Sequence, residues 1–216
     1  MMFKAVCFDF DYTLGDSTDS IVAGFVHGLT GLGWPAPDRE AVRGTIGYML
    51  EDAYTMLTGD RDLARQARFR ALFTEAARER QIQETTLFPG APELLQGLKA
   101  RGIRCAIVSS KRGDTIRLIL DRLGLGDTVE LVVGSGDVAR AKPDPEGLRA
   151  VMERLGAAPE QTLFCGDTVL DAGAAQNAGT HFAAVLNGTT PASAFGQFLP
   201  DHIAPDLWDL AEWLGL

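Results

Sequence analysis

The stretch FDFDYTLGDS, residues 8–17, holds the first side chains of this sequence that could do chemistry. Asp9 and Asp11 come at the end of an apolar run that starts at Phe3. Side chains two positions apart in an extended strand point to the same side, so the two carboxylates would face one point in space. Like charges held this close repel, and each raises the pKa of the other unless a cation or a proton lies between them. The pair therefore indicates a site that binds a positive group.

Polar side chains also close three later apolar segments. AIVSSK contains Ser109 and Ser110, TLFCGDTVLD contains Asp167 and Asp171, and Lys142 in ARAKPDP follows the segment VELVVG. Ligands of an open parallel sheet bind outside the carboxyl ends of its strands. We therefore expect these side chains to meet Asp9 and Asp11 at one edge of a sheet.

The types of these side chains indicate a reaction. Carboxylate oxygens suit a hard cation such as Mg²⁺, which would also offset the repulsion between Asp9, Asp11 and Asp167. Serine hydroxyls, backbone N–H groups and a lysine suit the oxygens of a phosphoryl group. Together they predict phosphoryl transfer, in which positioning and charge neutralisation do most of the catalysis.

The elements that must position these residues alternate along the chain. Short apolar segments typical of buried strands lie at 103–108, 129–134, 162–167 and 181–186, and helical patterns lie at 92–102, 114–125, 144–156 and 171–179. This order predicts right-handed crossovers and an α/β fold, a Rossmann-like doubly wound parallel sheet.

The segment from residue 16 to residue 85 breaks this alternation. It has no comparable strand and predicts several helices, one of them over residues 61–81. We therefore divide the chain into a core domain, residues 1–15 and 86–216, and an inserted α-helical domain, residues 16–85. The arginines of the 61–81 helix are mixed with Asp62, Glu75 and Glu79, which favours a solvated face over an anion-binding one.

Composition limits the possible partners and the compartment. The net charge of −9 disfavours nucleic acid or an anionic membrane as a partner. Asp9 and Asp11 interrupt the N-terminal apolar run before a secretory signal could form, so we expect a cytoplasmic protein. The three cysteines lie in apolar segments without metal-ligand spacing, which predicts buried, reduced thiols.

Four motifs in this order, DFDYTLGDS, IVSS, Lys142 in AKPDP and GDTVLD, resemble those of the haloacid dehalogenase superfamily. The likeness covers nearly the whole chain, including a helical cap inserted after the first motif, as in the phosphoglycolate phosphatase-like branch. The resemblance implies that Asp9 is a nucleophile that forms an aspartyl-phosphate. It also implies that Asp11 protonates the leaving oxygen and then activates water.

The resemblance assigns the remaining polar residues as well. Ser109 and Lys142 would hold the phosphoryl oxygens, with Ser110 beside them. Mg²⁺ would be held by Asp9, the Asp11 carbonyl and Asp167, and Asp171 would support the metal or Lys142 from behind. Taken singly, each has a simpler explanation: a surface lysine before a turn, a pair of N-cap serines, and aspartates that cap a helix.

Two further residues, one inside the first motif and one in the insertion, need separate explanations. Tyr12 occupies the place where the family usually has Gly, and packing is the simplest explanation for it. Arg43 precedes a Gly-x-x-Gly segment in the insertion, GTIG, and could bind a substrate carboxylate or phosphate. A solvated arginine at a helix end explains Arg43 equally well.

The function predicted first is a Mg²⁺-dependent phosphatase acting on a small phosphomonoester, phosphoglycolate-like or a sugar phosphate. The enzyme would be a monomer or a homodimer. Dehalogenases lack an acid at the position of Asp11, and phosphonoacetaldehyde hydrolase needs a lysine in its cap, whereas no lysine lies between Lys4 and Lys99. A receiver domain would carry its phosphate-accepting aspartate on a later strand.

Three alternatives stay open. A β-phosphoglucomutase-like mutase shares the four motifs but has a histidine where this chain has Ile21, with His27 the nearest histidine. Inorganic pyrophosphatase activity also occurs in this branch. A non-catalytic binding protein with the same fold belongs to a different class, and the intact set of acids argues against it because unpaired carboxylates packed together are destabilising.

Overall fold

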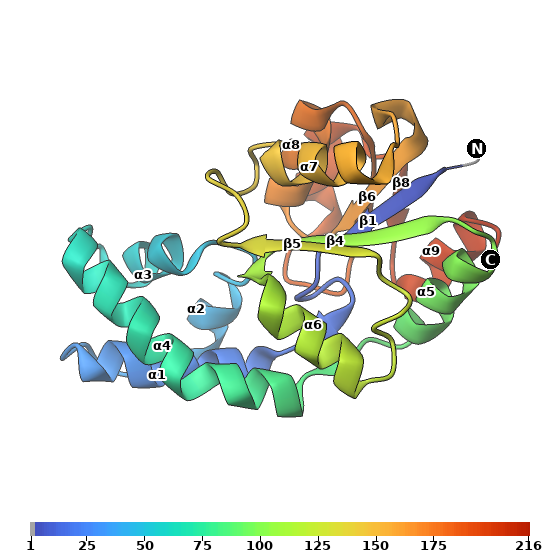
Figure 1. Cartoon of the computed structure of the whole chain (residues 1–216). Helices are drawn as coiled ribbons and strands as arrows, with labels where there is room; N and C mark the ends of the chain where they lie inside the picture. Colours follow the sequence, from blue (N-terminus) through green and yellow to red (C-terminus); the bar gives the residue numbers. More distant parts are fainter. Residues whose placement is uncertain (1–2) are drawn as a thin grey trace.

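The core of the computed structural model, which describes residues 3–216, is a six-stranded parallel sheet. The strand order is β5-β4-β1-β6-β7-β8 (Figure 1). The strands are β1 (Ala5–Phe8), β4 (Arg104–Arg112), β5 (Leu131–Ser135), β6 (Thr162–Gly166), β7 (His181–Val185) and β8 (His202–Ala204).

Helices cover both faces of this sheet (Figure 1). Alternate residues of each strand face opposite sides, so Val6 and Phe8 pack with one set of helices and Ala5 and Cys7 with the other. The first set is α5 (Ala91–Ala100), α6 (Gly113–Arg122) and α9 (Leu207–Trp213). The second is α7 (Glu146–Leu155) and α8 (Val169–Ala178), with the short 3-10 helix η2 (Ala192–Phe198). A further 3-10 helix, η1 (Pro159–Gln161), directly precedes β6 and buries no residue. The predicted doubly wound α/β core is confirmed.

Two parts of the core differ from the sequence-based prediction. The strand predicted over 103–108 continues as β4 to Arg112, with an irregular register after Val108, so Ser109 and Ser110 lie within the strand. β8 and α9 were not predicted. β8 has three residues, too few to show a hydrophobic period, and it is defined by its pairing with β7.

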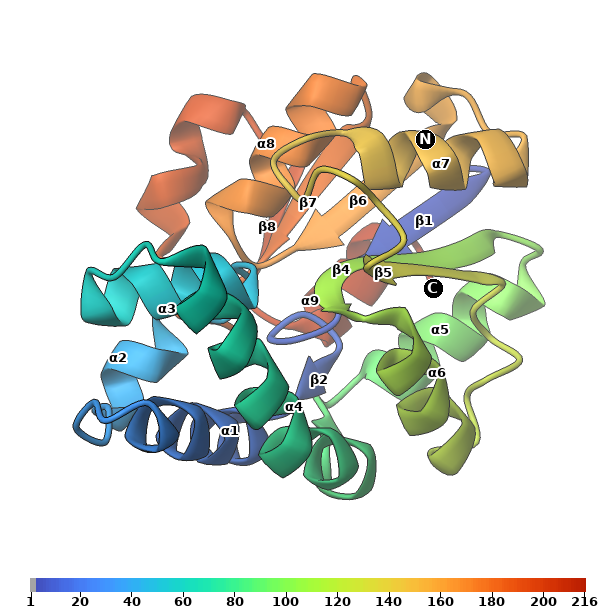
Figure 2. The same ribbon diagram turned by 60° about the vertical axis from the view of Figure 1, so that its left-hand side comes forward.

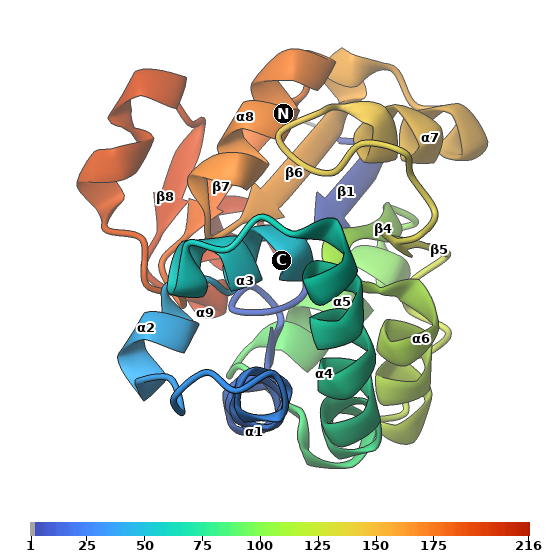
Figure 3. The same ribbon diagram turned by 90° about the vertical axis from the view of Figure 1, so that its left-hand side faces the viewer.

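The segment between residues 16 and 86 forms four helices. They are α1 (Thr18–Gly31), α2 (Arg39–Arg43), α3 (Leu50–Thr58) and α4 (Leu63–Glu84). α1 and α4 lie side by side (Figures 1 and 3) and share an aromatic core, in which the ring of Phe25 lies 5.2 Å from that of Phe69 and 5.4 Å from that of Phe73. The helices therefore have a hydrophobic core separate from the two cores of the sheet. We call this helical segment the cap.

The two connections between the sheet domain and the cap run together. β2 (Gly15–Asp16) and β3 (Thr86–Leu87) pair as a two-stranded antiparallel ribbon. Figure 2 shows β2 between the sheet and the cap helices. The cap lies beyond the carboxyl ends of β4 and β5, on the side toward which their arrows point (Figure 1). We call β2 and β3 the hinge strands, because rotation of the cap relative to the sheet would have to pass through them.

The three cysteines are buried and free, in the strands β1, β4 and β6. Burial raises the pKa of Cys105 to about 12 and raises the pKa of Cys7 and of Cys165 as well, so these thiols stay protonated. Within residues 3–216, no helix combines the length and the apolar character that a bilayer crossing requires.

Candidate active site

The site lies where the strand order reverses. β1 is in the middle of the sheet, and the strands that follow in the chain are added on one side as β4 and β5 and on the other as β6, β7 and β8. Loops that leave the carboxyl ends of β1, β4 and β6 therefore diverge and leave a crevice. Asp9 enters this crevice directly after β1, where its backbone N–H donates to the carbonyl of Cys165 at 2.9 Å.

Asp9 and Lys142 form a buried ion pair. The Asp9 residue is 1% exposed, and its Oδ1 accepts a hydrogen bond from the N–H of Phe10 at 2.7 Å. Its Oδ2 is buried without a hydrogen-bond partner, although Nζ of Lys142 lies 3.0 Å away as an ion-pair neighbour. An oxygen that is desolvated, negatively charged and free of hydrogen bonds is suited to attack an electrophile or to bind a cation.

Asp171 holds Lys142 from the other side. Nζ of Lys142 donates to Asp171 Oδ1 at 2.5 Å, while Asp171 Oδ2 accepts from the N–H and hydroxyl of Thr168. The Thr168 pair is also the capping box of α8, so the helix start fixes the carboxylate. Burial alone would lower the pKa of Lys142, but the carboxylates of Asp171 and Asp9 outweigh it and raise that pKa, so the ammonium stays charged.

Asp167 follows β6 and completes a cluster of acids. Its Oδ1 accepts a hydrogen bond from the hydroxyl of Thr13 at 3.1 Å. Burial and the neighbouring charges of Asp171 and Asp9 raise the pKa of Asp167 well above its ordinary value. The ionised form of the Asp167 carboxyl is therefore disfavoured unless a cation lies close to it.

The acid cluster fits a divalent metal ion. One carboxylate oxygen from each of Asp9, Asp167 and Asp171 lies within 4.8 Å of the others, and all three residues are buried. Oδ2 of Asp9 lacks a hydrogen-bond partner, whereas both oxygens of Asp171 are already bound by Lys142 and Thr168. The donor set is all oxygen, which suits Mg²⁺, with Asp9 and Asp167 as direct ligands and Asp171 behind them.

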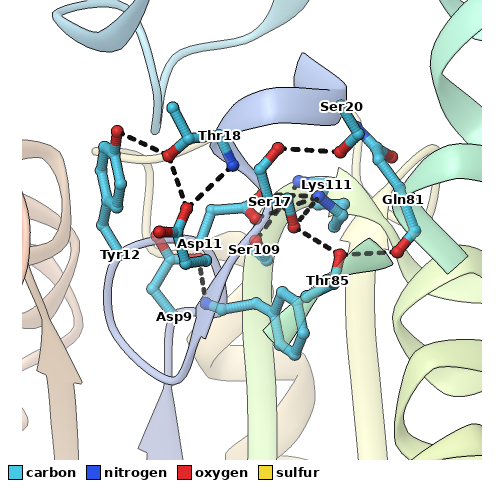
Figure 4. Close-up of polar contacts among 12 residues, drawn as sticks. Asp9, Asp11, Tyr12, Ser17, Thr18, Ser20, Gln81, Thr85, Ser109 and Lys111 are labelled. Carbon is cyan, nitrogen blue, oxygen red and sulfur yellow. Dashed lines mark hydrogen bonds and ion pairs between the residues drawn. The ribbon is translucent and has the colours of Figure 1, made fainter. Parts of the chain in front are cut away.

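Asp11 is turned away from this cluster. Nζ of Lys111 donates to both of its carboxylate oxygens, at 3.0 and 2.9 Å (Figure 4). Its side chain is therefore not one of the grouped acids, and Asp11 would reach a metal only through its backbone. Asp11 instead lines a cavity of about 620 Å³ between the sheet domain and the cap.

Ser109 and Lys142 line another, much smaller cavity, of about 20 Å³, together with Met49 of the cap. Gly47 of the same cap loop lies against Thr168: a Cβ there would lie 2.9 Å from Thr168 Cγ2, and φ is +102°. The loop of the cap that contains Gly47 therefore packs directly against the start of α8.

The comparison with protein families agrees with this geometry. The model of the haloacid dehalogenase-like hydrolases matches residues 6–185. This chain belongs to that family. It is a phosphatase-type hydrolase of the phosphoglycolate phosphatase-like branch, as the four motifs implied.

Relatives of this hydrolase align over nearly their whole length. The pyrophosphatase PpaX of Bacillus velezensis is 31% identical over 98% of this chain and 96% of its own. The phosphoglycolate phosphatase of Rhodospirillum rubrum is 31% identical over 98% of this chain and 91% of its own. The crystal structure of a putative haloacid dehalogenase-like hydrolase from Bacteroides fragilis, 36% identical, superposes with a TM-score of 0.93 and covers 96% of this chain and 99% of that one.

Arg43, which the sequence offered as a substrate-binding residue or a solvated arginine, does not line the larger cavity; it lines, with Tyr12 and Ser17, another cavity of about 380 Å³. Its Nε donates to the phenol oxygen of Tyr12 at 3.0 Å, and its Nη1 donates to Glu40. Tyr12 is buried with a φ of +60°, the left-handed conformation that glycine favours, so this position keeps the usual backbone with a larger residue. Beyond packing, Tyr12 thus joins the loop after β1 to the cap.

The structure adds two functional residues that the sequence analysis did not name. Lys111 binds Asp11, and Thr13 binds Asp167. Lys111 follows the two predicted serines directly and shares a strand face with Ser109, so the period of two was an available signal. No such signal marked Thr13, whose partner is 154 positions away.

Proposed function

We propose that this hydrolase removes the phosphoryl group from a small phosphomonoester, phosphoglycolate-like or a sugar phosphate, through an aspartyl-phosphate on Asp9 and with Mg²⁺. The observation that carries the proposal is Oδ2 of Asp9: it is buried, lies 3.0 Å from the ammonium of Lys142, and meets no other polar partner among residues 3–216. This is the arrangement that a carboxylate nucleophile needs beside a phosphoryl group.

In this mechanism Asp9 attacks phosphorus while Lys142 and the hydroxyl of Ser109 bind the phosphoryl oxygens. Asp11, at the wall of the larger cavity, would enter the first step as the carboxylic acid, with one oxygen still accepting from Lys111, and give its proton to the leaving oxygen. As the carboxylate it would then take a proton from the water that hydrolyses the aspartyl-phosphate. Asp171 keeps Lys142 in place through its bond at 2.5 Å. Mg²⁺, held by Asp9 and Asp167, would neutralise charge on the phosphoryl group.

The cap narrows the range of substrates. Among the cations that line the larger cavity, Lys111 pairs with Asp11 and Arg70 with Glu51. Arg78 and Arg112 share the single carboxylate of Asp114, so one positive charge is in excess there. A second anionic group on the substrate would offset this excess. We therefore place a phosphorylated small acid, of the phosphoglycolate type, ahead of a neutral sugar phosphate.

Pyrophosphate is the second candidate, because it also carries a second anion and a relative 31% identical is named a pyrophosphatase. A mutase is less well supported: Ile21 lines the cavity at the place where the mutase resemblance requires a histidine, and an alkyl side chain transfers no proton. A non-catalytic role would leave the buried acids Asp9, Asp167 and Asp171 without a reason to be grouped.

A substrate panel with Mg²⁺ tests this proposal. We expect release of phosphate from phosphoglycolate with a kcat/KM at least ~10-fold above that for glucose 6-phosphate, because only the former pairs a compact second anion with the cap arginines. Asp9→Asn is the control and should be inactive with every substrate. Preference for pyrophosphate would select the second candidate, and phosphate release by Asp9→Asn would refute the mechanism.

A further inference from the structure

Lys111 is a buried cation that the mechanism above does not use. It lies on β4, its side chain is 5% exposed, and its ammonium lies 5.8 Å from the centroid of the Phe10 ring. Burying an ammonium is costly unless it is paired and hydrogen bonded. The groups that hold Lys111 therefore indicate what it does.

All three donors of this ammonium are occupied. Nζ donates to Asp11 Oδ1 at 3.0 Å, to Asp11 Oδ2 at 2.9 Å and to the hydroxyl of Ser17 at 3.2 Å (Figure 4). A lysine ammonium has three N–H groups, so none is left for a substrate. Lys111 in this arrangement acts on Asp11 rather than on the ligand.

The third partner connects Lys111 to the hinge strands. Ser17 directly follows β2, and its hydroxyl lies 2.8 Å from that of Thr85, which directly precedes β3. The Thr85 hydroxyl donates to the carbonyl of Gln81 in the last turn of α4, so the Ser17 hydroxyl must donate to Thr85 and accept from Lys111. The hydrogen bonds thus run in one direction, from Lys111 to the cap.

We propose that Lys111 is a positioning residue that fixes the Asp11 carboxylate at the cavity and makes its position depend on the hinge strands. The inference rests on the proposed function, in which Asp11 transfers the proton. The path of hydrogen bonds that orients Asp11 therefore includes both hinge strands, through the hydroxyls of Ser17 and Thr85. Loss of a hydroxyl from this path should weaken the orientation of Asp11 without touching the substrate.

Leaving-group dependence distinguishes positioning of an acid from general packing. Lys111→Met should lower kcat for an alkyl phosphate about 100-fold and kcat for p-nitrophenyl phosphate less than ~10-fold, because nitrophenolate leaves without a proton. Lys99→Met, at a half-exposed lysine that pairs with Asp127 and lines none of the cavities described above, is the control for the same substitution and should affect the two substrates equally. Equal losses for both substrates in Lys111→Met would overturn the proposal.

The double variant Asp11→Asn, Lys111→Met provides the second test. It leaves no unpaired buried charge, so it avoids the main reason for misfolding of Lys111→Met. If Lys111 acts through Asp11, its removal in the Asp11→Asn background should change kcat and KM less than about twofold. A further large loss, or a raised KM, would mean that Lys111 binds substrate directly and would overturn the proposal.

The link to the hinge is tested by Ser17→Ala, with Ser20→Ala, whose hydroxyl donates to the Ser17 carbonyl, as its control. We expect Ser17→Ala to lower kcat for the alkyl phosphate about fivefold at unchanged KM. If the ratio of kcat for the alkyl phosphate to kcat for p-nitrophenyl phosphate were the same in Ser17→Ala as in the wild type, the link to the hinge would be overturned. Asp11→Asn separates the two proposals. If it lowered kcat equally for the alkyl phosphate and for p-nitrophenyl phosphate, the proposed function would fail. If Asp11→Asn lowered kcat more for the alkyl phosphate but Lys111→Met did not, only the role of Lys111 would fail.

Discussion

Asp9 and Asp11 are two positions apart, yet their surroundings are different. Oδ2 of Asp9 has no hydrogen bond and lies beside Lys142, while both oxygens of Asp11 are bound by Lys111. The first arrangement leaves a lone pair free for attack, and the second holds a carboxylate still at the wall of a cavity. The two residues should therefore fail in different ways when their charge is removed.

We predict that Asp9→Asn is inactive, because it removes the attacking oxygen, and that Asp11→Asn accumulates the aspartyl-phosphate when supplied with p-nitrophenyl phosphate. Asn at position 11 cannot activate water, so the second step stops while the first continues. Intact mass spectrometry should show one added phosphoryl group on Asp11→Asn, which peptide mapping should place on Asp9. A phosphoryl group mapped to a residue other than Asp9 would mean that the nucleophile has been assigned wrongly.

Among the elements, the loop after β1 is joined to the cap by Tyr12 as well as by the hinge. The phenol oxygen of Tyr12 accepts a hydrogen bond from Arg43 at the end of α2 and lies 2.9 Å from the hydroxyl of Thr18 at the start of α1. A left-handed backbone costs a residue other than glycine roughly 1 kcal/mol. The buried ring and its cap contact offset that cost.

We predict that Tyr12→Phe and Arg43→Met each destabilise the protein and that their effects are not additive. The coupling free energy should be about 0.5–1 kcal/mol, the usual net value of one hydrogen bond, measured by urea unfolding of both single variants and the double variant. Tyr12→Phe keeps the ring, so packing is controlled. A coupling near zero, together with a raised KM for anionic substrates in Arg43→Ala alone, would instead favour binding of substrate by Arg43.

At the scale of the whole molecule, the reversal of strand order gathers buried acids that repel one another. Burial and the charges of Asp171 and Asp9 raise the pKa of Asp167 above its ordinary 3.8, so the folded protein without a cation holds this proton more tightly than the unfolded chain. Stability without metal should therefore fall as pH rises above about 4 toward the raised pKa. A divalent cation bound to the ionised cluster would reverse this loss.

We predict that Mg²⁺ raises the melting temperature relative to EDTA by several degrees at about pH 8 and much less at about pH 5, where Asp167 retains its proton more often. EDTA should also abolish phosphatase activity and Mg²⁺ should restore it, with Ca²⁺ a poor substitute because its coordination is looser. Asp167→Asn is the control and should lose most of the metal-dependent shift. Full turnover in EDTA, or a shift independent of pH, would contradict the assignment of the metal site.

The sheet and most of the polar residues at its carboxyl edge could be predicted without coordinates. Alternating apolar segments predicted the doubly wound core because burial on both faces requires runs such as LVV and FCG, and four motifs in order predicted the family. These signals are local: each depends on residues within one element. For the same reason the sequence analysis missed β8, whose three residues become a strand only by pairing with β7.

Tertiary structure alone decided which polar groups meet. Lys111 and Asp11 are 100 positions apart, and Thr13 and Asp167 are 154 apart, so no spacing in the sequence relates them. The sequence left Arg43 open between substrate binding and a solvated helix end, and neither interpretation named Tyr12, to which its guanidinium donates a hydrogen bond. Local periodicity determines which face a side chain occupies, but the partner on that face is set by how the sheet, the hinge strands and the cap pack together.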